Sequence, residues 1–133
     1  MISSLVSRVS AAVLLLGGVT LLFASDVVLP ALVPAFPPAA VWLGQLLAAA
    51  WLGVAALNWF QRGALLGGIY GRSVVVANVA LYFISASSLL RALVDGSATA
   101  VLWLVFAPLA VLAAVYGALM LRGPFDPLQG PGS

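Results

Sequence analysis

Three polar side chains recur at helical spacing inside one long apolar run. Asn78, Tyr82 and Ser85 stand at positions i, i+4 and i+7, which places them within about 60° of one another on one face of a helix. Polar groups in lipid seek partners, and an interhelical hydrogen bond contributes about 0.6 to 2 kcal/mol. The pattern therefore predicts a face that packs against neighbouring helices. The alternative is one wall of a small polar cavity.

Partners for that face are expected on other helices, and the candidates are Gln45, Asn58 and Tyr116. On an ideal helix, Gln45 and Asn58 point about 140° apart. The two side chains therefore cannot both line one narrow site.

The chain has few side chains that could take part in acid–base catalysis. Asp26, Asp95 and Asp126 are the only acidic residues, and the sequence has no histidine, glutamate, lysine or cysteine. General acid–base catalysis needs such groups within reach of one reacting atom, and the sequence spacing brings no two of them together. Oxygen-only metal sites would need the same scattered aspartates. The sequence predicts a protein that is not an enzyme and that holds no metal or cofactor.

Glycines repeat every fourth residue between two arginines, at Gly63, Gly67 and Gly71. In a membrane helix this spacing permits close approach of backbones, but its place in a polar connection favours a flexible turn. A phosphate-binding P-loop is excluded because its lysine, its first glycine and the preceding strand are all missing.

The flanking arginines of this connection, Arg62 and Arg72, are candidate contacts for lipid headgroups. A basic residue near an anionic membrane surface contributes roughly 1 kcal/mol of binding free energy. The alternative is that the two arginines only set the orientation of the chain in the membrane.

The composition decides which elements must position these residues. The 133 residues are 65% hydrophobic and 6% charged, with a mean hydropathy of +1.24, whereas soluble chains are roughly half apolar and a quarter charged. Lipid is the solvent that accepts such a surface. The pI of about 9.7 rests on a net charge of +2 without a basic run, so nucleic acid is not an expected partner.

Four apolar runs each approach the roughly 20 residues that a helix needs to cross a bilayer. We predict an all-α, polytopic four-transmembrane-helix bundle with helices at about 5–25, 39–60, 73–93 and 99–121. The first helix is expected to remain uncleaved, and four prolines between residues 30 and 38 are expected to end it. Residues 1–121 form a single membrane domain, followed by a flexible C-terminal tail, 122–133.

The arginines predict the orientation, because positive residues in short loops stay on the cytoplasmic side. Four of the five arginines fall on one side of the arrangement and only Arg91 falls on the other. The expected topology is N-in/C-in, in a multi-pass protein of the cell membrane, namely the bacterial inner membrane.

The sequence Leu57-Asn58-Trp59, followed by Gly67 to Arg72 and then Asn78, resembles small uncharacterised bacterial four-helix membrane proteins. The layout is similar to that of DoxX-type proteins, with a short first helix, a proline-bearing outer loop and four spans. The resemblance covers most of residues 5–121 as layout and carries no established site residues. It implies positions to test between the second and third helices. With the third-helix face, the candidate polar site comprises Asn58, Tyr70, Arg72, Asn78, Tyr82 and Ser85.

These observations predict a non-catalytic accessory or scaffolding membrane subunit. An oligomeric channel or small-solute transporter is the alternative, because a passive pore can use Asn, Ser and Tyr alone. Coupled transporters usually carry an ionisable residue within the membrane, and the centres of the four runs lack one. The expected partners are the lipid bilayer and either another membrane protein or further copies of this chain.

Overall fold

The computed structural model describes residues 2–66, 69 and 71–123, and every described element is helical. Four helices, each long and apolar enough to cross a membrane, make up this part of the chain. The predicted all-α class and the four span-length helices are thereby confirmed. The elements in chain order are α1 (Ile2–Leu32), η1 (Pro38–Ala40), α2 (Trp42–Phe60), α3 (Arg72–Val94) and α4 (Leu102–Arg122).

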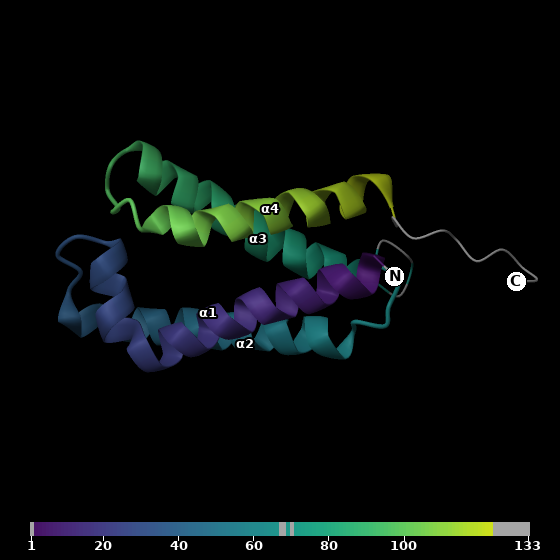
Figure 1. The fold of residues 1–133 in the computed structure, drawn as a ribbon, viewed down its shortest axis with the longest axis horizontal. Coiled ribbons are helices and arrows are strands. Elements are labelled where there is room, and N and C mark those ends of the chain that lie inside the picture. The colour runs from purple at the N-terminus through teal and green to yellow at the C-terminus, as the bar shows by residue number, and fades with distance from the viewer. Residues whose placement is uncertain (1, 67–68, 70, 124–133) are drawn as a thin grey trace, which may run out of the picture.

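The helices form two antiparallel pairs, with α1 packed along α2 and α3 packed along α4 (Figure 1). The pairs meet over a short stretch, and α3 runs away from α1 and α2 as it proceeds. One core of buried residues nevertheless joins all four helices, and it includes Leu14, Trp51, Tyr82 and Tyr116.

The two ends of the bundle differ in charge. The start of α1, the end of α2, the start of α3 and the end of α4 lie at the same end of the bundle (Figure 1). They carry Arg8, Arg62, Arg72 and Arg122, and we call this the arginine end. The opposite end holds the α1–α2 and α3–α4 connections with Asp26, Arg91 and Asp95, and we call it the aspartate end.

Helix α1 continues seven residues beyond the end predicted near Ser25 and includes Pro30. The backbone is non-helical at Ala24, where the helix kinks. The Ser25 hydroxyl donates to the Leu21 carbonyl oxygen, and this competition with the backbone bends helices. Pro30 lies only two residues before the helix ends, so its missing N–H removes one hydrogen bond from the last turn. The other three predicted spans differ from the observed helices by at most three residues at either end.

Close packing of α1 on α2 depends on glycines. A Cβ at Gly17 would lie 2.5 Å from the ring of Trp51, and one at Gly44 would lie 2.8 Å from Leu29 Cδ1. Both distances are too short for a side chain to be added without movement of its neighbour. Gly44 therefore allows the segment of α1 after the kink to stay against α2.

At the aspartate end, the α3–α4 connection is tied to the end of α1. The Thr99 N–H donates to the Leu32 carbonyl over 2.9 Å, and the Thr99 hydroxyl donates to the Ala31 carbonyl over 2.6 Å. The last carbonyls of a helix have no partner within that helix. Thr99 thus caps α1 and joins the two helix pairs at this end.

The α3–α4 connection is also ordered from within. The Ser97 N–H donates to the Asp95 carboxylate over 2.9 Å. Hydrogen bonds from Ser97 hold the pKa of Asp95 below its usual range, and the charge of Arg91 adds a smaller effect in the same direction. Gly96 has a φ of +76°, a conformation that glycine adopts readily in a tight turn.

Candidate functional site

Two asparagines form a reciprocal pair between α2 and α3. Asn78 Nδ2 donates to Asn58 Oδ1 over 2.6 Å, and Asn58 Nδ2 donates to Asn78 Oδ1 over 2.8 Å. Asn78 Nδ2 also donates to the Val74 carbonyl of its own helix over 2.8 Å. Both side chains are fully buried. The amides therefore satisfy one another in a place where solvent does not reach them.

Ser10 brings α1 into the same group. Its hydroxyl accepts from Asn58 Nδ2 over 2.8 Å and donates to Asn78 Oδ1 over 3.3 Å. The Tyr82 hydroxyl lies 2.5 Å from the same Ser10 oxygen. We call Ser10, Asn58, Asn78 and Tyr82 the polar cluster. It joins three helices near the arginine end, at the place where the two helix pairs meet.

Helix α4 reaches the cluster through a tyrosine pair. The rings of Tyr82 and Tyr116 stack with centroids 5.7 Å apart and planes 23° apart, an arrangement that adds to simple burial of the rings. The Tyr116 hydroxyl lies beside Ser7 and Ser10. Among the described residues, the hydroxyls of Ser7 and Tyr116 make no hydrogen bond of acceptable geometry.

The structure brings together three of the six residues predicted for the polar site, namely Asn58, Asn78 and Tyr82. Ser85 is half-buried one turn further along α3 and takes no part in the hydrogen bonds of the cluster. Arg72 is exposed at the first position of α3. Tyr70 lies outside the described residues. Gln45, considered as a partner for the face, is exposed on α2.

Ser10 is the cluster residue that the sequence analysis missed. Ser3, Ser7 and Ser10 are all buried, and they follow the same i, i+4, i+7 spacing as the third-helix residues. The Ser3 hydroxyl accepts the Leu66 N–H over 3.2 Å, so this stripe also holds the α2–α3 connection. The matching period of polar residues in the first span was the signal available.

The polar cluster consists of neutral groups that use their hydrogen-bonding capacity on one another. A buried polar group is costly when it is unpaired and acceptable when it is satisfied. The arrangement therefore serves to fix three helices in one register. No three His, Cys, Asp or Glu side chains meet as a metal site within the part of the chain that is described.

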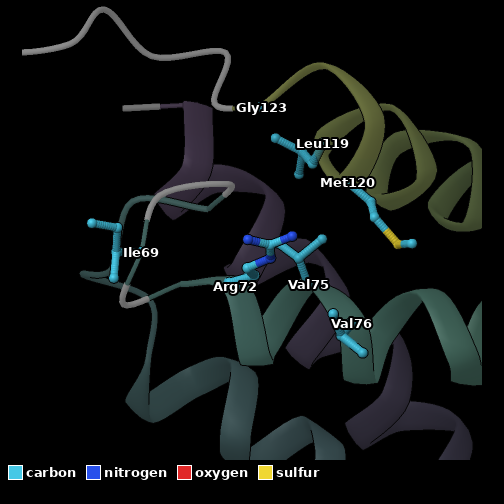
Figure 2. Close-up of a pocket in the computed structure, with 7 residues that line it drawn as sticks. All are labelled: Ile69, Arg72, Val75, Val76, Leu119, Met120 and Gly123. Atoms are coloured by element: carbon cyan, nitrogen blue, oxygen red, sulfur yellow. The ribbon is translucent and has the colours of Figure 1, made fainter.

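The predicted headgroup contacts, Arg62 and Arg72, differ in their surroundings. Figure 2 shows Arg72 extending from the start of α3 toward the end of α4, where it lines a cavity of about 300 Å³. The Arg62 guanidinium lies 4.4 Å from the ring centroid of Trp59 and donates to the Trp59 carbonyl over 2.7 Å. Arg72 has apolar neighbours in its cavity: Ile69, Val75, Val76, Leu119, Met120 and Gly123.

Comparison of the chain with protein-family models, with curated proteins and with solved structures gives no match. The likeness to DoxX-type proteins therefore remains one of layout, and no residue role follows from it.

Replacing Asn78 by leucine leaves the Asn58 amide buried without its main partner, so we expect Asn78→Leu to lower the free energy of unfolding by about 1 to 2 kcal/mol. Asn58→Leu should have a similar cost. The double variant should lose less than the sum of the two, because it leaves no orphaned amide. Reversible unfolding in mixed micelles measures all three. Ser85→Ala is the matched control and should change stability by less than about 0.5 kcal/mol; strictly additive losses would contradict the pairing.

Proposed function

We propose that the protein is an integral membrane protein of the cell membrane, in bacteria the inner membrane, and that it acts as a non-catalytic accessory or scaffolding subunit. Large apolar side chains on the outside of all four helices support insertion. Leu16 is 71% exposed, Phe60 79%, Phe83 63% and Leu104 77%. Water would penalise such a surface, whereas lipid accepts it.

The proposed orientation places the arginine end in the cytoplasm, so that both termini are cytoplasmic. Four arginines at that end against Arg91 alone at the other match the retention of positive residues on the cytoplasmic side.

The accessory role is supported by the position of the polar side chains inside the bundle and of a groove on its outer surface. The polar cluster is closed inward and holds the helices together, which leaves the lipid-facing surface to apolar packing. A groove of about 660 Å³ between α3 and α4 has alanine and glycine along its α4 side. Small residues let a neighbouring helix approach closely. Its α4 residues include Ala110, Ala113, Ala114, Gly117 and Ala118.

We propose an apolar transmembrane helix of another protein as the occupant of this groove. The larger apolar side chains that line the groove are Phe83, Leu90, Phe106 and Leu121, and Arg122 lies at its arginine end. A helix there would replace lipid against small side chains without burying a charge. Ala110 to Ala118 spans about 12 Å, a distance over which two helices can stay in close contact.

Single-cysteine labelling tests the orientation, because the chain has no cysteine of its own. In intact cells, a thiol at Ser97→Cys should react with an impermeant maleimide from outside. A thiol at Ser133→Cys should react only after the membrane is opened. Equal labelling of both in permeabilised cells is the control, and the reverse pattern would overturn the proposed topology.

A photo-crosslinking residue at Ala114, in the groove, tests the accessory role in the native membrane. It should join the protein to one different membrane protein, and native mass spectrometry of the gently extracted complex should show that subunit in fixed stoichiometry. The same residue at Leu16, which is exposed on α1, is the matched control and should give no such product. A closed homo-oligomer would favour the channel alternative instead, and a lone monomer would contradict both roles.

A further inference from the structure

A second groove lies on the other helix pair, between α1 and α2. Its volume is about 400 Å³. Alanines form its floor, of which Ala11 and Ala55 are buried, while Leu15, Leu52 and Phe60 stand along its sides. The groove is apolar over its length, and its polar lining residue is Arg8 at the arginine end.

The groove runs from the arginine end toward the middle of the bundle. From Arg8 to Leu15 the rise along α1 is about 10 Å, and from Phe60 to Leu52 along α2 it is about 12 Å. If the helices cross a bilayer as proposed, the groove starts at headgroup level and reaches well into one leaflet, whose hydrocarbon is about 15 Å deep. An elongated apolar chain fits this shape.

One arginine lines the mouth of the groove, and a second lies against a tryptophan that lines it. Arg8 is exposed and lines it, and Trp59 lines the opposite side. Arg62 is stacked on that Trp59 ring and hydrogen-bonded to the Trp59 carbonyl, which holds its charge close by. The described aspartates, Asp26 in the last part of α1 and Asp95 directly after α3, lie at the other end of the bundle. Neither arginine therefore has a carboxylate partner among the described residues, and the mouth favours an anion.

We propose that this groove binds one anionic phospholipid, with the phosphate held between Arg8 and Arg62 and one acyl chain lying along the alanine floor. The inference rests on the proposed membrane insertion and orientation. Only an amphiphile with a negative head uses both features of the site. A free phosphate would meet the arginines and leave the groove empty, and a zwitterionic lipid would fill the groove with little gain from the charges.

Trp59 has a positioning role in this site. Its ring forms one side of the groove and carries Arg62 on its surface, and arginine over an aromatic face is a stable arrangement. Guanidinium groups bind phosphate through paired hydrogen bonds, so fixing the direction of Arg62 prepares the mouth for the headgroup.

The test uses the full chain in nanodiscs and measures lipid retained on the protein by native mass spectrometry after release. With equal phosphatidylglycerol and phosphatidylcholine in the disc, we expect one phosphatidylglycerol to be retained roughly tenfold over phosphatidylcholine. R8Q combined with R62Q should remove this preference. R91Q, which removes a positive charge at the aspartate end, is the matched control and should leave it unchanged.

Two further experiments distinguish a lipid headgroup from free phosphate, and the role of the groove from that of the arginines. A56F adds a ring to an exposed position of the groove and should lower retention of phosphatidylglycerol while both arginines remain. Inorganic phosphate at millimolar concentration should displace the lipid poorly. If phosphate displaces it fully and A56F has no effect, the site binds a free anion and the lipid proposal is wrong.

The outcomes also separate this inference from the proposed function. A protein that enters nanodiscs but retains the two lipids equally, or loses its preference as much in R91Q as in the R8Q and R62Q variant, contradicts the lipid site alone. A protein that stays in solution without detergent and enters no nanodisc contradicts membrane insertion itself.

Discussion

The reciprocal hydrogen bonds between Asn58 and Asn78 are the interaction on which the rest of the arrangement depends. In apolar surroundings, burial of each amide is costly unless it is hydrogen-bonded to the other. The pair therefore fixes α2 and α3 in one register. Ser10 on α1 is hydrogen-bonded to Asn58, and Tyr82 on α3 stacks on Tyr116 of α4. These contacts fix the positions of α1 and α4 as well. The two helix pairs pack extensively within themselves and only briefly against each other. A small number of directed polar contacts therefore determines how the pairs meet.

In this arrangement the polar cluster lies in the interior of the bundle, and the grooves lie on its outer surface. The side chains of the polar cluster hydrogen-bond to one another and hold the helices together, and the outer surface presents apolar side chains with a groove on each helix pair. The groove between α3 and α4 is lined with small residues and suits a helix. The groove between α1 and α2 is lined by Arg8, has Arg62 stacked on its Trp59, and suits a charged lipid. Both proposals place the activity of this protein in what it binds within the membrane.

Much of this architecture follows from local sequence. Continuous apolar runs define four helices, and the period of Asn78 and Tyr82 identifies the face of α3 that turns inward. Ser85 shares that period but is only half-buried, because the buried line along α3 runs from Asn78 through Tyr82 to Ala86. Ser10 was missed because the spacing of Ser3, Ser7 and Ser10 indicates a buried face of α1 but does not show which helix that face meets. The end of α1 was predicted too early because a proline two residues before a helix end removes a single backbone hydrogen bond, and the helix continues past the kink at Ala24 to Leu32.

Asparagine-selective ¹⁵N labelling offers the most direct test of the central pair, because the chain contains only Asn58 and Asn78. Two side-chain amide groups should then appear in the spectrum of the protein in micelles or nanodiscs. If the two side chains are paired, both amides exchange slowly with water and a nuclear Overhauser effect connects their protons. Rapid exchange of either amide, or two slow amides without that connection, would contradict a bundle held by this pair.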